Sequence, residues 1–369
     1  MVHKPRILFL ATFPPPVHGS AVVSKQIKES KTINGAFDGD YVNIGTSRKV
    51  EEIGKKSLFV NLKKGFRYLG MLARIFFLLL THKYDLCYCA ITCRGKGFIK
   101  DVPVVLLCKL FNRKTVIHQH NKGMSEYVNR RIYKFLYKKV YTNTKVILLS
   151  EQLYSDISSL VKREDVMLCP NGIKPSLDSV IAHGNSQCPH ILFLSNLMIA
   201  KGVMVLLDAL KILKEKGYTF VCDFVGSKTK EIDQQRFSSE VSSRGLEGYA
   251  LYHGAKYGAE KYGFFQAAEM FVLPSFNEAF PLVNLEAMEY SLPIVSTNVG
   301  GIPDQVNDGV NGYIIEPGDV VALADKLAAL LDAPQLRVKM GQTGRSYFEA
   351  RYTEEQFEAC MTRCLNECM

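Results

Sequence analysis

The chain has 369 residues, 47% of them hydrophobic and 22% charged, and it contains no repeat or low-complexity tract. A single hydrophobic core usually stops growing at roughly 250–300 residues, so we expect two folded domains and exclude a disordered or fibrous protein. The formal net charge of +10 is uneven, because residues 1–184 contain 30 Lys and Arg against 13 Asp and Glu, whereas residues 185–369 contain 16 against 23. We therefore expect the first half to face an anionic partner, either a nucleic acid or an anionic membrane surface.

The ten cysteines show no paired pattern of the kind that secreted domains use for disulfides. The apolar run at residues 7–13 is followed by three prolines instead of a small-residue cleavage site. Both observations predict a cytoplasmic protein. Cys360, Cys364 and Cys368 fall on one helical face without a nearby histidine, so we expect buried thiols and no zinc site.

Short apolar runs alternate with helical patterns along the whole chain, which is typical of βα units and parallel sheets. The expected strands are residues 6–11, 40–44, 86–91, 115–118 and 146–149 in the first half, and 190–195, 220–225, 250–253, 270–274 and 293–296 in the second. The polar residues 174–189 predict a linker between the halves. The predicted fold is α/β, with a Rossmann-like domain over 1–184, a second over 185–350, a cleft between them and a C-terminal helix over 351–369.

The first strand leads through a proline-rich loop to Gly19 and Ser20, where a helix is expected to begin. A glycine at such a junction can expose backbone N–H groups toward a phosphate. Farther along, Asp38-Gly39-Asp40 resembles a metal-binding Asp-x-Asp triplet, but such a triplet arises by chance in a chain of this composition. We interpret it as a turn.

Residues 55–83 predict a basic amphipathic helix. Its apolar residues recur at helical spacing, and its basic residues fall on another face with Gly70: Phe59, Leu62, Phe66, Leu69, Ala73 and Phe76 against Lys63, Arg67 and Arg74. Residues 130–139 repeat this mixture of basic and aromatic side chains. Two interpretations stay open, namely attachment to an anionic membrane surface and two ordinary helices with solvated basic faces.

His120 follows the expected strand at residues 115–118 and would therefore lie at the edge of the cleft. His118, inside that strand, is expected to be a supporting core residue. In the second half, Lys201-Gly202 follows a strand and begins a helix. A lysine opposes the positive end of the helix dipole, so its presence is best explained by a bound phosphate, although an exposed lysine costs only tenths of a kcal/mol there.

Two glutamates lie eight residues apart in the run from Glu278 to Glu286, just after the expected strand at residues 270–274. Pro281 is suited to the first position of a helix, which would leave the N–H groups of Leu282 and Val283 available to an anionic or hydroxyl-rich ligand. Each carboxylate can accept hydrogen bonds from a diol, one from a sugar and the other from a ribose. A pair of solvated surface glutamates is the plain alternative.

The chain resembles the family 4 glycosyltransferases, which are retaining enzymes with the GT-B fold of two Rossmann-like domains. The resemblance rests on the Glu278-to-Glu286 motif with Phe280-Pro281-Leu282 inside it, on Lys201-Gly202, on Pro170-Asn171-Gly172 and on Gly300-Gly301-Ile302-Pro303-Asp304. It implies donor-binding roles for Gly19, Asn196, Lys201, Phe280, Pro281, Leu282 and Glu286, and catalytic roles for Glu278, Lys201 and His120. It also implies a C-terminal helix that returns to the first domain.

One position departs from the family pattern. The family often has an arginine where this chain has Asn196, so a bidentate phosphate contact is missing. Asn196 itself, Lys256 or Lys261 are the candidates for replacing that contact.

The predicted activity is transfer of a sugar from a UDP- or GDP-sugar to a hydroxyl acceptor, without a metal or another cofactor. The expected acceptor is lipid-linked or a saccharide of a bacterial surface polysaccharide, and the expected location is the cytoplasm, with attachment to the inner face of the membrane as an option. No nucleic acid is expected as a partner. Two alternatives stay open, namely a nucleotide-sugar epimerase of the same architecture and a non-catalytic nucleotide- or nucleic-acid-binding module.

Overall fold

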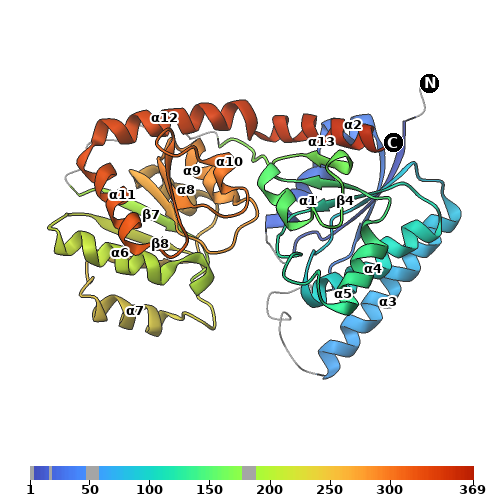
Figure 1. Ribbon diagram of the computed structural model, residues 1–369, viewed down its shortest axis with the longest axis horizontal. Helices are drawn as coiled ribbons and strands as arrows, with labels where there is room; N and C mark the ends of the chain where they lie inside the picture. Colours follow the sequence, from blue (N-terminus) through green and yellow to red (C-terminus); the bar gives the residue numbers. More distant parts are fainter. Residues whose placement is uncertain (1–3, 16–18, 47–57, 177–187) are drawn as a thin grey trace. The chain divides into compact units, whose positions relative to one another are not determined.

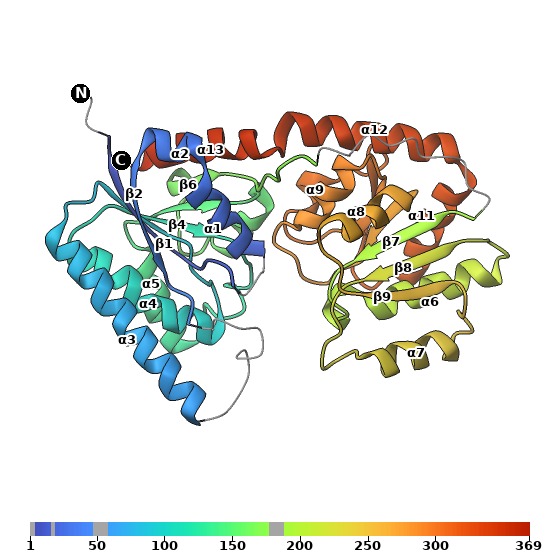
Figure 2. The same cartoon turned by 180° about the vertical axis from the view of Figure 1, so that it is seen from behind.

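The computed structural model describes residues 4–15, 19–46, 58–176 and 188–369, without the side chains of residues 58–62 (Figures 1 and 2). It divides into two compact units, Met1–Asn171 with Glu355–Met369 and Gly172–Glu354. Each unit contains one six-stranded parallel sheet, which confirms the predicted α/β class with two Rossmann-like domains. The predicted boundary at residue 184 and most of the predicted linker lie outside the described residues.

The sheet of the first unit has the strand order β2-β1-β3-β4-β5-β6. Its strands are β1 (Arg6–Ala11), β2 (Asp38–Asn43), β3 (Leu86–Cys89), β4 (Thr115–Gln119), β5 (Lys145–Leu148) and β6 (Val166–Leu168). The interpretation of Asp38 to Asp40 as a turn is wrong. These residues begin β2, since Asp38 pairs in register with Arg6 and the Asp40 carboxylate accepts a hydrogen bond from the Arg6 guanidinium at 2.9 Å.

Helices cover both faces of this first sheet (Figures 1 and 2). One face carries α1 (Gly19–Glu29), α2 (Lys31–Ala36) and α13 (Glu354–Cys368), and the other carries α3 (Leu58–Thr81), α4 (Gly95–Leu110) and α5 (Arg131–Tyr141). Two short 3-10 helices, η2 (Glu151–Asp156) and η3 (Arg163–Asp165), lie between β5 and β6. Within the described residues, no helix is long and apolar enough to cross a membrane.

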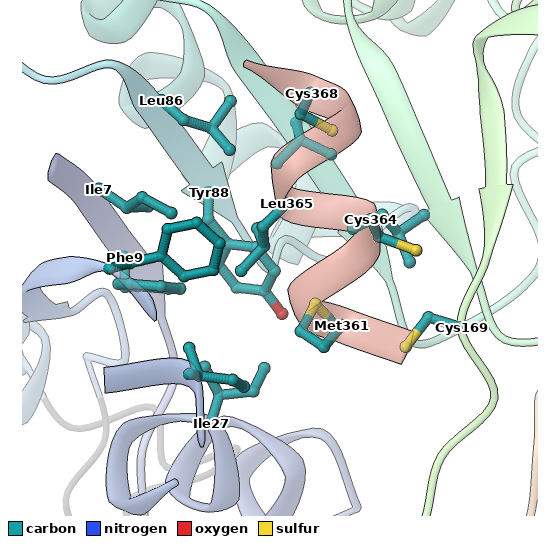
Figure 3. Packing of buried hydrophobic residues seen from close by; sticks show 14 of the residues in the cluster. Ile7, Phe9, Ile27, Leu86, Tyr88, Cys169, Met361, Cys364, Leu365 and Cys368 are labelled. Atoms are coloured by element: carbon teal, nitrogen blue, oxygen red, sulfur yellow. The ribbon is translucent and has the colours of Figure 1, made fainter. Parts of the chain in front are cut away.

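The C-terminal helix α13 belongs to the core of the first unit, as predicted (Figure 3). Its buried side chains Met361 and Leu365 share one hydrophobic cluster with Phe9 of β1, Ile27 of α1 and Tyr88 of β3. Fully burying one such side chain contributes roughly 1.5–3 kcal/mol, which explains how a helix at the end of the chain is held on a sheet formed by its beginning.

All ten cysteines are free thiols, and the predicted burial of the C-terminal ones is confirmed for Cys364 and Cys368. Cys360 is half-buried and lies next to Cys169, Cys364 and Arg363. The pKa of the Cys360 thiol is lowered, first by a hydrogen bond from Cys169 and then by one from Cys364, with a further contribution from the Arg363 guanidinium.

The sheet of the second unit has the strand order β12-β11-β10-β7-β8-β9. Its strands are β7 (His190–Leu194), β8 (Val221–Val225), β9 (Ala250–Gly254), β10 (Met270–Leu273), β11 (Ile294–Thr297) and β12 (Gly312–Ile315). Its helices are η4 (Ile199–Lys201), α6 (Val203–Glu215), α7 (Gln234–Ser243), α8 (Gly258–Ala267), α9 (Leu282–Glu289), α10 (Ile302–Gln305), α11 (Val320–Asp332) and α12 (Pro334–Arg351). The sequence patterns had not predicted β12, which is short and has two of its four side chains only partly buried.

Candidate active site

The strand order of the second sheet reverses between β7 and β10, since β8 and β9 extend it in one direction and β11 and β12 in the other. Ligands of such sheets bind outside the carboxyl ends of the strands at this switch point, where two neighbouring loops diverge. Lys201 lies in the loop after β7, and Glu278 lies in the loop after β10. Two residues that the sequence analysis selected independently thus stand on the two sides of this point.

The side chains of Lys201 and Glu278 form an ion pair, with 2.5 Å between Lys201 Nζ and Glu278 Oε1. The lysine side chain is 25% exposed and the glutamate 13% exposed, so the pair is partly shielded from water. Because an ammonium group has three N–H donors, this contact leaves donors for a second anion.

The glycine after Lys201 explains how the two loops come so close. Gly202 adopts the left-handed conformation, with φ of 78°, and caps α6. A Cβ atom at this position would lie 2.0 Å from the carbonyl oxygen of Pro274, so only glycine fits. The amide of Phe276 also donates to the carbonyl of Ala200 at 2.9 Å, which ties the loop after β10 to the loop after β7.

The loop after β11 supports the Glu278 segment from the other side. Gly300 has φ of 57°, and a Cβ there would lie 2.0 Å from the carbonyl oxygen of Glu278. The Gly301 amide donates to the carbonyl of Ala279 at 2.7 Å. The Gly300-Gly301 pair therefore fixes the backbone on which the Glu278 carboxylate stands.

Helix α9 begins at Leu282, one residue later than predicted, with Pro281 as its N-cap. The N–H groups of Leu282 and Val283 lie in its first turn, where an α-helix offers no intrahelical acceptor. The start of the helix is held by Gln305, whose amide donates to the carbonyl of Pro281 at 3.1 Å. Phe280 is 5% exposed and packs edge-on against Tyr352, so its side chain is not available to a ligand.

The second glutamate of the motif also has a lysine partner. Glu286 accepts a hydrogen bond from Lys261 of α8 at 2.7 Å, and both side chains are 18% exposed. The other candidate base, Lys256, contacts Glu260 at 3.4 Å on the surface. Asn196 lies on the exposed loop after β7 and accepts from the amide of Ser227 at 3.4 Å. Of the three candidates for replacing the missing arginine, Lys261 is therefore the one that contacts the motif.

Gly19 and His120 belong to the first unit. Gly19 is the first residue of α1, after β1, and β1 with β3 forms the switch point of that sheet. His120 follows β4, and its ring centroid lies 4.0 Å from that of His118. His118 is fully buried and bonded to the Tyr88 hydroxyl at 2.6 Å, as expected for a core residue. Burial and, next, the proximity of His120 lower the pKa of His118.

Two supporting carboxylates had not been predicted. Asp156 of η2 accepts hydrogen bonds from the amides of Gly123, Met124 and Ser125 at 2.9–3.0 Å, which orders the loop that follows His120. Asp223 of β8 bridges the rings of His190 and His253 at 2.7 Å each. Isolated aspartates carry no sequence signal for such contacts, because their partners lie on other loops and strands. In the described part of the chain, no cluster of His, Cys, Asp and Glu could hold a metal ion.

Comparison with known proteins finds a family match within the second unit. Residues 182–347 match the sequence model of the glycosyl transferases group 1. The chain is 27% identical over 228 residues to the capsular polysaccharide biosynthesis glycosyltransferase CapM of Staphylococcus aureus, a match that covers 58% of each chain. The chain thus spans little more than half the length of this curated relative.

The fold resembles two solved structures over almost its whole length. Sucrose-phosphate synthase from Thermosynechococcus elongatus superposes with a TM-score of 0.78, 19% identity and 99% coverage of both chains. HepE from Anabaena, in complex with UDP and glucose, superposes with a TM-score of 0.72, 18% identity, and coverage of 99% of this chain and 100% of HepE. At these identities the likeness concerns the fold alone. Together with the two six-stranded sheets, it shows that the chain has the GT-B fold, and residues 182–347 of this fold are similar to the group 1 glycosyl transferases.

Proposed function

We propose that the chain is a retaining, metal-independent glycosyltransferase that moves a hexose-type sugar from a nucleotide diphosphate sugar to a hydroxyl acceptor. The observation that carries the proposal is the presence of two lysine–glutamate pairs at one edge of the second sheet, Lys201 with Glu278 and Lys261 with Glu286. The lysines can bind phosphate oxygens and the glutamates can accept hydrogen bonds from hydroxyl groups. A nucleotide sugar presents both kinds of group.

Each residue has a stated role in this proposal. Glu278 accepts hydrogen bonds from the donor sugar, and Glu286 accepts them from the ribose. Lys201 and the free amides at the start of α9 hold the diphosphate. Lys261 replaces the family arginine that is missing at Asn196, since its ammonium already reaches Glu286.

Two residues of the first unit also have proposed roles. Gly19 allows the backbone to approach the diphosphate, and His120 contacts the sugar. When the bond between the sugar and the diphosphate breaks, negative charge grows on the leaving phosphate oxygen. Lys201 and the α9 amides stabilise that charge, which is the main catalytic effect of the protein. The leaving phosphate then accepts the proton of the attacking hydroxyl, on the same face of the sugar.

The proposed acceptor is a lipid-linked or saccharide intermediate of a bacterial surface polysaccharide. Two observations support it, namely the similarity to a capsular polysaccharide enzyme and the basic first half of the chain. The proposed location is the cytoplasm, at the inner face of the membrane.

A panel of UDP- and GDP-sugars in a thermal-shift assay identifies the donor, since a ligand at about 100 times its dissociation constant stabilises the folded state by about 2.7 kcal/mol. Proton NMR of early product then reads the anomeric configuration, and the same reaction is run in excess EDTA. We expect retention and full activity. An inverted anomer, or activity lost in EDTA and restored by Mn²⁺, contradicts the proposal, and an isomer formed from the donor alone indicates the epimerase.

A further inference from the structure

Several large apolar side chains of α3 are exposed on the outside of the first unit. Phe66 is 75% exposed, Leu69 is 61% exposed and Phe77 is 62% exposed, whereas Ile75 and Leu79 on the opposite side are buried. In an ordinary surface helix the apolar stripe faces the core and the polar face meets water. Helix α3 buries a narrow stripe and leaves its larger apolar surface outside.

The two neighbouring helices do the same. Leu110 at the end of α4 is 74% exposed, and Ile132 and Phe135 of α5 are 68% and 61% exposed. Among the described residues, ten of the 18 exposed large hydrophobic side chains lie on these three helices, which pack side by side on one face of the first sheet. Single exposed apolar residues are common, but a contiguous group of this size marks an interaction surface.

The exposed group surrounds an apolar groove of about 680 Å³ between α3 and α4. Every residue that lines it is apolar: Leu72, Ala73, Phe76, Phe77, Pro103, Leu106, Leu107 and Leu110. The groove offers no polar side chain that could hold a sugar or a nucleotide, so its chemistry fits hydrocarbon.

The helices that carry this apolar surface are strongly basic. The three helices contain eleven Lys and Arg and a single acidic residue, Asp101. The Asp101 side chain is 3% exposed and is paired with Lys100 at 2.6 Å, so the surface of these helices shows no free carboxylate. A strongly basic surface with an apolar centre complements the anionic headgroups and hydrocarbon of a lipid bilayer.

We propose that the outer face of α3, α4 and α5, here named the α3–α5 face, docks on the surface of an anionic lipid bilayer. Its phenylalanine and leucine side chains enter the edge of the hydrocarbon layer, and its lysines and arginines contact the headgroups. A second copy of the chain is a poor occupant, because two such basic faces repel each other. A nucleic acid would satisfy the charges but leave the apolar groove in water. The α3–α5 face would account for the membrane location that is part of the proposed function, whatever sugar the enzyme transfers.

The test is flotation of the full chain with vesicles of neutral lipid and with vesicles that contain anionic lipid. The first variant combines Phe77→Ser, Leu110→Ser and Phe135→Ser, all at exposed positions where the fold loses little. The second combines Arg131→Gln, Lys134→Gln and Lys138→Gln on α5. The matched control is Val321→Ser in the second unit, at a position that is 61% exposed.

We expect the wild type and the control to bind anionic vesicles and to bind neutral ones weakly. The serine variant should bind at least about tenfold more weakly, and the glutamine variant about fivefold more weakly for each charge removed. Equal binding by wild type and serine variant overturns the proposal, and so does a change in oligomeric state or oligonucleotide binding without a change in vesicle binding. Thermal shift with the donor is measured on every variant. If a variant loses vesicle binding but is still stabilised by the donor as the wild type is, the loss concerns docking alone. If the donor stabilises neither the wild type nor the variants, the proposed enzymatic function fails, whatever the vesicle result.

Discussion

Replacing Lys201 with alanine should lower turnover much more than it lowers stability. Lys201 is placed to stabilise charge on the leaving diphosphate, and removing one such preorganised donor typically costs about 10²-fold in kcat, or about 2.7 kcal/mol of barrier height. The substitution also leaves the Glu278 carboxylate, which is 13% exposed, without its partner at 2.5 Å.

The stability cost follows from the burial of this ion pair. Fully exposed pairs contribute about 0–1 kcal/mol, and breaking a fully buried pair costs about 3–5 kcal/mol. The Lys201–Glu278 pair lies between these limits, so we expect the free energy of unfolding to fall by about 1–2 kcal/mol. A domain with an ordinary stability of about 5–15 kcal/mol stays folded after such a loss.

The assay measures release of the nucleoside diphosphate from the donor in the presence of acceptor, with kcat and KM determined separately. Urea unfolding of the same preparation gives the stability. The matched control is Lys211→Ala on α6, because Lys211 forms an exposed pair with Glu215 at 3.7 Å, with side chains 48% and 62% exposed. A Lys201→Ala enzyme that keeps wild-type kcat would refute the assignment and show that another base holds the diphosphate.

Three further predictions concern the motif, the loop and the thiols. Glu286→Gln should chiefly weaken donor binding, whereas Glu278→Gln should chiefly lower kcat, and wild-type kinetics for both variants would contradict the assigned roles. Gly202→Ala should lower the free energy of unfolding by at least about 1–2 kcal/mol, since alanine at φ of 78° is strained and its Cβ would meet a backbone carbonyl at 2.0 Å, and an unchanged urea midpoint would contradict this. Cys360 should react with iodoacetamide at a lower pH than an ordinary thiol, because its folded pKa is lowered, first by a hydrogen bond from the Cys169 thiol. The reactive thiolate is present above this lowered pKa and is lost as the pH falls through it. Mass spectrometry locates the label, and labelling that rises only above about pH 8, as for an ordinary thiol, would show that the pKa is unshifted.

Much of the fold was predictable because its signals are local. The expected strands that form the two sheets are short apolar runs, and each is recognisable without knowledge of its neighbours. Pro281 was also recognisable as the start of a helix, whereas the left-handed conformation of Gly202 and Gly300 was seen only in the structure. The three-residue strand β6 and the start of β2 at Asp38 were missed, because they are strands only through pairing with β5 and β1.

The sequence by itself determined the elements, the spacing of the two glutamates and the presence of an amphipathic helix within residues 55–83. Only the tertiary structure decided which side chains meet. Lys201 and Glu278 are 77 residues apart, and they pair because β7 and β10 are neighbours in the sheet and the loops after them touch at Gly202. Periodicity likewise shows that α3 has an apolar face but not where that face points, because the direction depends on which neighbouring elements the helix packs against. The structure shows that most of this face lies on the outside.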